Sequence, residues 1–220
     1  MKNIVLYGAP GAGKGTQAAL LAEKFNLMHL STGEMLRAEV AQGTSLGQRV
    51  KGIMERGDLV GDDIVLSLID KALTANLAGE PRDEWDEQRR QRAIENGQNV
   101  AERKVPSIIF DGFPRTVQQA QMLEFVFSRR QMRLDAVISI DVNRDELIRR
   151  IHERAAISNR ADDNDDATIR HRLEEYEEKT HPVLEYYKVS GLLVSIDGGG
   201  EISETNTRLC SLMEHLLRDE

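Results

Sequence analysis

Cysteine is nearly absent from this chain of 220 residues, which contains only Cys210. A single cysteine excludes an internal disulfide and a four-cysteine zinc site. Long apolar runs are also absent, and none reaches the length of a membrane span. Only Met1, Lys2 and Asn3 precede the apolar run from Ile4 to Tyr7, which is too little for a signal peptide, so we expect a cytoplasmic protein.

An excess of basic charge is missing as well. The chain has 29 Lys and Arg residues against 37 Asp and Glu residues, which gives a net charge of -8. This balance disfavours a protein that binds nucleic acid over its whole surface. We therefore expect small-molecule partners, with no nucleic acid and no membrane among them.

Short apolar runs separated by helical segments predict the fold. A chain of this length buries roughly 70% of its unfolded surface, enough for a single α/β domain over residues 1–220 with small appendages. The alternation is typical of a five-stranded parallel sheet flanked by helices. The predicted strands are 2–7, 28–30, 107–110, 136–140 and 192–196. Glycines divide residues 35–60 into short helices, which indicates a small helical insert.

The segment from Gly8 to Thr16 lies between the first predicted strand and a helical run from Gln17 to Phe25. Strand, glycine-rich turn and helix form the setting of a phosphate-binding loop, whose backbone N–H groups hold phosphates while Lys14 reaches the terminal ones. The hydroxyl expected directly after the lysine is displaced, because Gly15 stands there. That shift disfavours a switch GTPase or a motor ATPase. The alternative is a glycine-rich turn without a ligand.

An acidic and a basic side chain follow the predicted strand at 107–110. Asp111 ends this strand, where a carboxylate of a phosphate-loop protein holds magnesium or its waters. The alternative is an aspartate that caps a helix. Arg115 follows at the carboxyl edge of the sheet, where open α/β folds bind ligands, and its planar fork of donors suits a phosphate.

Several arginines lie near glycine turns in this acidic chain. Arg150 and Arg154 are four residues apart, so they share one face of a predicted helix. We expect these two to contribute to a basic site that binds two phosphorylated ligands, as phosphoryl transfer requires. The other members of this site would be Arg37, Arg115, Arg160 and Arg172. A solvated basic surface is the alternative, and it is preferred for Arg129, Arg130, Arg133 and Arg149.

Five motifs in one order indicate a family. They are residues 8–16, Ser31 to Arg37, Gly57 to Val60, Phe110 to Thr116 with Gln119, and Asn159 to Asn164. From Met1 to about Gly200 the chain resembles the adenylate kinases. The resemblance implies magnesium-dependent phosphoryl transfer, ATP + AMP ⇌ 2 ADP, with ATP as co-substrate. It also implies an AMP-binding insert at residues 32–61 and a short lid at residues 154–163.

The resemblance also assigns roles to residues by position. The ATP side would comprise Gly11, Ala12, Gly13, Lys14, Gly15, Thr16, Arg150, Arg154 and the backbone near Gly200. AMP would be held by Thr32, Arg37, the backbone of Asp58, Leu59 and Val60, and by Gly112, Phe113, Pro114, Arg115 and Gln119. Arg160 and Arg172 would bind phosphates of both nucleotides, and Asp111 would hold magnesium through water. The catalytic residues would be Lys14, Arg115, Arg154, Arg160 and Arg172.

The chain departs from the family in two segments. Its lid is short and has no cysteines, so we expect no zinc there. Residues 79–105 exceed the link usual in the family and contain the only tryptophan, Trp85. A tolerated surface loop is the preferred interpretation, because the cost of loop closure grows slowly with length. A self-association or partner surface around Trp85 is the alternative.

Other activities are not excluded at this point. Pyrimidine nucleotide kinases resemble this chain but usually have Ala in place of Thr32 and Asn near Thr116 and Gln119, so AMP is preferred over UMP, CMP or GMP. A GTP donor is another alternative, since the segment near Gly200 has no lysine. A regulatory nucleotide-binding protein would lack a catalytic group, and none is missing among Lys14, Asp111, Arg115, Arg160 and Arg172. We expect a monomer.

Overall fold

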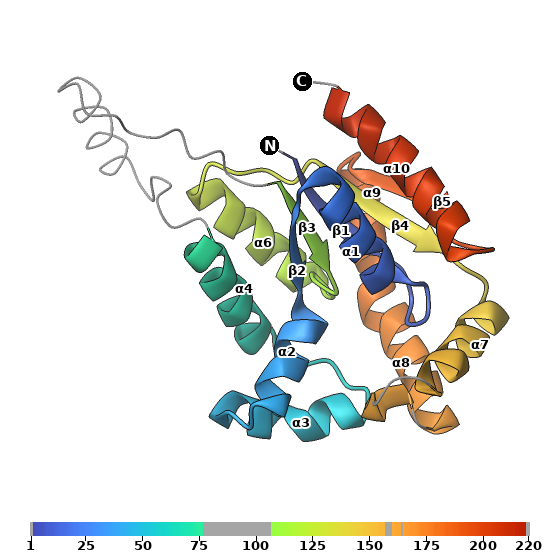
Figure 1. The fold of residues 1–220 in the computed structure, drawn as a ribbon. Coiled ribbons are helices and arrows are strands. Elements are labelled where there is room, and N and C mark those ends of the chain that lie inside the picture. Colours follow the sequence, from blue (N-terminus) through green and yellow to red (C-terminus); the bar gives the residue numbers. More distant parts are fainter. Residues whose placement is uncertain (1, 77–106, 157–159, 164, 219–220) are drawn as a thin grey trace.

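Five parallel strands form the centre of the protein in the computed structural model, which describes residues 2–76, 107–156, 160–163 and 165–218 (Figure 1). The strand order is β2-β3-β1-β4-β5, and every pairing is parallel. The strands are β1 (Asn3–Tyr7), β2 (Met28–Ser31), β3 (Ile108–Asp111), β4 (Ala136–Asp141) and β5 (Leu193–Asp197). The predicted α/β class and all five predicted strands are confirmed, and the carboxyl ends of the strands share one edge.

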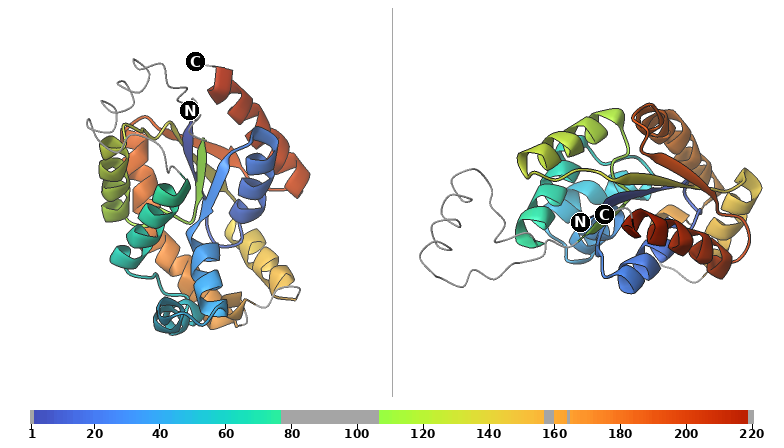
Figure 2. Two further views of the ribbon diagram at one scale, coloured as in Figure 1. Left: turned by 60° about the vertical axis from the view of Figure 1, so that its left-hand side comes forward. Right: turned by 90° about the horizontal axis from the view of Figure 1, so that it is seen from above.

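Helices cover both faces of this sheet, as Figures 1 and 2 show. One face carries α1 (Lys14–Phe25) and α10 (Ile202–Arg218), and the other carries α4 (Asp62–Asn76), α6 (Val117–Arg129) and α9 (His181–Val189). The central strand β1 alternates between the two cores, with Ile4 and Leu6 packed towards α1, and Val5 and Tyr7 towards α6 and α9. Because strand side chains point alternately to opposite faces, Ile4 to Tyr7 must supply bulky side chains that pack into both cores.

The remaining helices lie beyond the carboxyl edge of the sheet (Figure 1). These are α2 (Thr32–Ala41), α3 (Ser45–Glu55), α7 (Arg144–Ala155), the 3-10 turn η1 (Ala161–Asp163), α8 (Asp166–Glu175) and the π-helix η2 (Tyr176–Thr180). Polar side chains fix several of their starts. Ser31 caps α2 by accepting from the Glu34 N–H at 3.4 Å, and Asn143 caps α7 by accepting from the Glu146 N–H at 2.9 Å.

The helical segment after residue 165 is interrupted near Pro182. Helix α8 passes into the π-helix η2, and Pro182 then stands in the first turn of α9. Proline has no N–H to donate, so the regular hydrogen-bond pattern cannot run through this position. The predictions for residues 79–105 and Trp85 lie outside the described residues, as do Asn159 and Asn164 of the last motif.

Candidate active site

The loop between β1 and α1 has the backbone that its glycines allow. Gly11 and Gly13 adopt φ of 89° and 86°, which side chains of other residues rarely tolerate. A Cβ on Gly11 would also lie 2.6 Å from the carbonyl oxygen of Leu147 on α7. The loop therefore packs closely on α7 and leads into the N-terminus of α1, where N–H groups point outwards.

Lys14 begins α1 and folds back over this loop. Its Nζ donates to the carbonyl oxygens of Gly8 at 2.6 Å and Ala9 at 3.1 Å. Burial lowers the pKa of Lys14 to about 8; the charge of Asp111 opposes this shift, and those of Arg115, Arg172 and Arg154 add to it. The lysine thus shares one electrostatic environment with the acidic residue and three of the predicted phosphate ligands.

Gly15 brings the backbone at the start of α1 close to Asp111. A Cβ on Gly15 would lie 3.4 Å from Oδ2 of Asp111, so this helix position faces the carboxylate directly. Thr16 follows Gly15, and both residues line a cavity that Asp111 also lines. The absence of a side chain at position 15 leaves the carboxylate free of a direct neighbour from α1.

Asp111 ends β3, beside Leu6 of β1 and Ser31 of β2 in the sheet register. Ser31 donates its hydroxyl to Oδ2 of Asp111 at 3.1 Å, and Nε2 of His29 lies 4.0 Å from the same oxygen. The carboxylate is thereby oriented towards the cavity, of which Asp111 is a lining residue. The capping role weighed for Asp111 does not describe this geometry, because Thr116 caps the next helix.

The loop after Asp111 is held by a chain of hydrogen bonds. The Gly112 carbonyl accepts from the Thr32 hydroxyl and from Nε of Arg115, both at 2.8 Å. The Arg115 N–H donates to Oε1 of Gln119 at 2.7 Å, and Nε2 of Gln119 donates to Asp62 of α4 at 2.6 Å. The backbone around Arg115 is therefore tied to α2, α6 and α4 at once.

The helical insert completes this side of the site. A smaller cavity of about 90 Å³ is lined by Thr32, Arg37, Asp58, Leu59, Val60, Gly112, Arg115 and Gln119, among others. The Arg37 guanidinium lies over Gly33, where a Cβ would be 3.2 Å from Nη1. Burial lowers the pKa of Arg37, and the nearby charge of Arg160 lowers it further. The glycine makes room for the cation.

Arg154 and Arg172 both bind the buried carboxylate of Asp163. Asp163 of η1 is 1% exposed, and it accepts from Nε and Nη2 of Arg154 at 2.7 and 2.8 Å and from Nη1 of Arg172 at 2.6 Å. Although burial raises the pKa of Asp163, its hydrogen bonds to Arg154 and Arg172 hold that pKa below the usual range. The carboxylate fixes both guanidinium groups at the cavity wall.

The insert also touches α8 directly. Nε2 of His171 lies 2.8 Å from Oδ1 of Asp58, and a Cβ on Gly57 would be 2.5 Å from Cγ of Arg172. Only a glycine, here with φ of 80°, allows the insert to approach α8 so closely. The contact closes the site between the insert and the arginine-bearing helices.

The phosphate loop, Asp111 and the Arg115 loop line one cavity of about 420 Å³ together with Arg37, Arg154, Arg160 and Arg172. Six basic side chains reach it, Lys14, Arg37, Arg115, Arg154, Arg160 and Arg172, against the carboxylates of Glu34, Asp111 and Glu175. In a chain of net charge -8, this local excess of positive charge describes a site for polyanions. The structure thus brings the separately predicted arginines together.

Three of the predicted ATP-side residues do not line this cavity. Ala12 is 2% exposed and packs in the core, so only its backbone could contact a ligand. Arg150 pairs with Glu146 at 2.7 Å and donates to the carbonyls of Gly198 and Gly200 at 3.0 and 2.9 Å. Arg150 therefore holds the loop around Gly200 and does not point at the phosphate loop.

Sequence reasoning missed several supporting residues. Asp163, Asp62 and Ser31 orient predicted ligands, yet the sequence assigns none of them a role in the site. Asp163 could have been found, since the acidic pair Asp162-Asp163, two residues after Arg160 in an arginine-rich region, indicates ion pairing. Nothing in the sequence indicates that Asp62 reaches Gln119, because 57 positions separate them.

The fold and this cavity define a phosphate-loop nucleotide-binding protein with a second basic subsite. A family model described as adenylate kinase matches residues 6–92 and 95–192. The chain is 43% identical to an adenylate kinase of Thermus thermophilus, over 94% of each chain. It is 40% identical to one of Leptospira biflexa, over 96% of this chain and all of the relative. An adenylate kinase of Phenylobacterium zucineum is 44% identical over 92% of each.

The chain belongs to the adenylate kinase family, and it is a phosphotransferase. Members of this family bind ATP and AMP and use Mg²⁺. The family predicted from five sequence motifs is therefore confirmed. Within the residues that the structure describes, no group of three or more His, Cys, Asp or Glu side chains is arranged to hold a metal ion, and no helix is long and apolar enough to cross a membrane.

Proposed function

We propose that the protein catalyses ATP + AMP ⇌ 2 ADP, with ATP phosphates on the loop of residues 8–16 and AMP on the Arg115 side. The observation that carries this assignment is the shared cavity. The phosphate loop and the loop around Arg115 open into it from neighbouring strands, and six basic side chains line it. Two phosphorylated ligands can therefore meet end to end at one site.

The residues would act mainly by position and charge. Lys14 would neutralise charge that develops on the transferring phosphoryl group, and Arg115 would orient the acceptor phosphate. Arg154, Arg160 and Arg172 would surround the transferring group from the side of the lid. Asp163 would keep Arg154 and Arg172 in place before the nucleotides bind. Closure of residues 154–163 over the site would exclude water, which would otherwise accept the phosphoryl group.

The oxygen ligands at this site fit magnesium. Mg²⁺ in nucleotide enzymes takes one or two carboxylates together with substrate phosphates and waters. Asp111 presents a carboxylate oriented by Ser31, and the Thr16 hydroxyl lines the same cavity. We propose that Asp111 holds the ion through water, and that the ion neutralises phosphate charge when bound. We expect no zinc at the lid, since its stretch has no cysteine.

AMP is the proposed acceptor because of Thr32 and Gln119. Both side chains lie at the smaller cavity beside Arg115, where a base would enter. A kinase for UMP, CMP or GMP is the alternative. ATP is the proposed donor, with its base against the loop that Arg150 holds at Gly198 and Gly200; GTP is the alternative there. A monomeric state and a cytoplasmic location stay predictions.

A coupled assay of ADP formation tests the proposal. Each monophosphate, AMP, UMP, CMP and GMP, is paired in turn with ATP and GTP at equal concentrations. We expect kcat/KM to be highest for ATP with AMP, by at least about tenfold. A higher value for another monophosphate would replace the acceptor assignment, and a higher value with GTP would replace the donor.

A two-site inhibitor made of two adenosines joined by five phosphates is expected to bind at least about 100-fold more tightly than ATP, since one molecule fills both subsites. The control is the same pair of adenosines joined by two phosphates, which is too short to span both. Calorimetric titration measures the three affinities. Equal binding of the long and short compounds would contradict the two-nucleotide site.

The pH dependence of kcat/KM is expected to fall as pH rises through about 8. The lowered pKa of Lys14, about 8, means that the lysine is charged below this pH and neutral above it in the free protein. Bound phosphates favour the charged form, so kcat should fall only at higher pH. Steady-state kinetics from about pH 6 to about pH 10 test this. A constant kcat/KM over that range would contradict it.

A further inference from the structure

Tyr7 places a hydroxyl at the junction of the two nucleotide subsites. It is the last residue of β1, directly before the phosphate loop, and it is 4% exposed. Its hydroxyl donates to the carbonyl oxygen of Pro114 at 2.6 Å. Pro114 directly precedes Arg115, so one hydrogen bond joins the strand that leads into the phosphate loop with the loop that carries the acceptor-side arginine.

We propose that Tyr7 is a positioning residue for the acceptor phosphate, because it fixes the carbonyl that precedes Arg115. This inference rests on the proposed binding of AMP at Arg115. The other bonds of this loop reach α2 and α6 through Thr32 and Gln119. The bond from Tyr7 sets the loop relative to the central strand, and therefore relative to the phosphate loop.

The tyrosine is suited to this task over a wide pH range. Burial raises its pKa well above the ordinary value, and neighbouring Tyr187 and Tyr176 raise it further. The hydroxyl therefore stays protonated and remains a donor. Without it, the buried Pro114 carbonyl would lose its partner, and an unsatisfied buried carbonyl is costly enough to displace a loop.

The chain provides a matched control in the same aromatic cluster. The rings of Tyr7 and Tyr187 lie 6.4 Å apart, and the hydroxyl of Tyr187 is buried without a hydrogen-bond partner among the described residues. Tyr7→Phe and Tyr187→Phe each remove one buried hydroxyl from one core. Only Tyr7→Phe breaks a bond to the acceptor loop, so a merely structural role would separate the two variants in stability but not in KM for AMP.

The test compares KM for AMP, KM for ATP and kcat in both variants. We expect Tyr7→Phe to raise KM for AMP about three- to tenfold, the worth of one neutral hydrogen bond, and to leave KM for ATP within about twofold. Tyr187→Phe should leave all three parameters within about twofold. Equilibrium titrations with each nucleotide, well below the lower unfolding midpoint, separate binding from any loss of stability.

Three results would overturn the role of Tyr7. They are an unchanged KM for AMP, equal rises in KM for both nucleotides, and the same response in Tyr187→Phe. A rescue variant with para-aminophenylalanine at position 7 keeps a donor and should return KM for AMP to the wild-type value; failure to do so also overturns the proposal. The placement of AMP beside Arg115 is tested separately, because it fails if Arg115→Ala does not weaken AMP binding selectively.

Discussion

Lys14→Met is expected to lower kcat at least about 100-fold while the protein stays folded. The ammonium is buried in the phosphate loop and shares its environment with Asp111, Arg115, Arg154 and Arg172. Such a charge acts most strongly on the transferring group, where negative charge develops in the transition state. Removal of a comparable preorganised group costs about 10²- to 10³-fold in rate.

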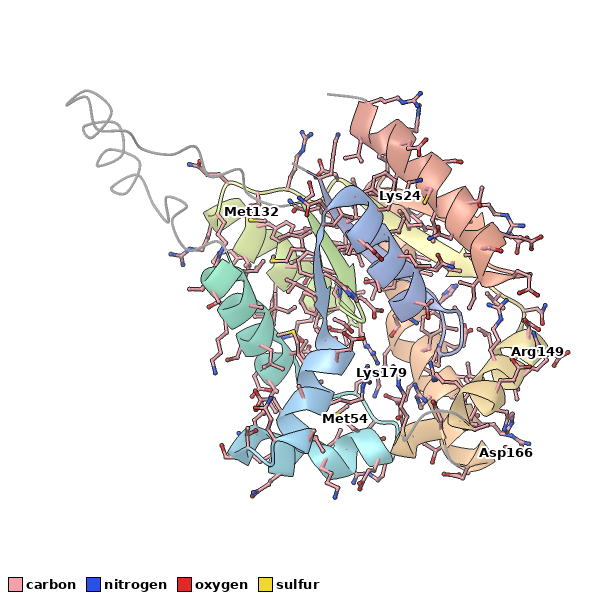
Figure 3. All side chains as sticks on the ribbon, in the orientation of Figure 1. Lys24, Met54, Met132, Arg149, Asp166 and Lys179 are labelled. Carbon is pink, nitrogen blue, oxygen red and sulfur yellow. The ribbon has the colours of Figure 1, made fainter. Side chains whose placement is uncertain are left out.

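Lys24→Met is the matched control for this variant. Lys24 lies on the same helix α1, at the end away from the phosphate loop (Figure 3), and pairs with Glu214 on the surface. An exposed ion pair contributes little, so activity and unfolding midpoint should stay near wild type. Steady-state kinetics and thermal unfolding are measured for both variants. A Lys14→Met protein with more than about a tenth of wild-type activity, about 1.4 kcal/mol of barrier, would refute the role of Lys14.

Arg115→Ala is expected to lower the affinity for AMP by about 100-fold and the affinity for ATP by less than about threefold. The Arg115 guanidinium is tied to Gly112 by Nε, and its backbone is tied to Gln119, so the side chain is held ready at the cavity wall. Its loss removes a positioned charge on one side only. Titration of AMP and ATP separately, with Arg115→Lys as a second variant that keeps the charge but not the planar fork, measures the selectivity.

Arg149→Ala is the control on the outer face of α7 (Figure 3). Arg149 is 58% exposed and pairs with Glu146 and Glu153 on its own helix. Its loss should change neither nucleotide affinity beyond about twofold, since exposed pairs on a helix are weak. An equal loss of AMP and ATP affinity in Arg115→Ala would show that the arginine serves both nucleotides and that the assignment to one subsite is wrong.

The strands and the phosphate loop could be predicted because their signals are local. An apolar run such as Ile4 to Tyr7 can be buried on both faces only in a sheet with two cores, which is what the structure shows. Gly11 and Gly13 have the positive φ angles that the loop motif requires. Asp111 and Arg115 were predicted at the carboxyl edge of the sheet because a parallel strand ends there.

The supporting contacts could not be predicted because they join distant segments. The bonds from Tyr7 to Pro114 and from Gln119 to Asp62 depend on how α4, α6 and the Arg115 loop pack on β1. The partners of Arg150 likewise could not be predicted from the sequence. Its position on the face of Arg154 was predicted correctly, but only the packed structure shows that it turns to Gly198 and Gly200.

The sequence by itself thus determined the α/β fold, the family and the six basic residues that line the cavity, since each follows from local pattern and motif order. Only the tertiary structure decided which carboxylates hold the arginines, how the insert meets α8 through Asp58 and His171, and which hydroxyl joins β1 to the Arg115 loop. The physical reason is the distance along the chain over which each kind of interaction acts. Backbone preferences act over a few residues, whereas ion pairs and buried hydrogen bonds form between whichever groups the packed core brings within about 3 Å.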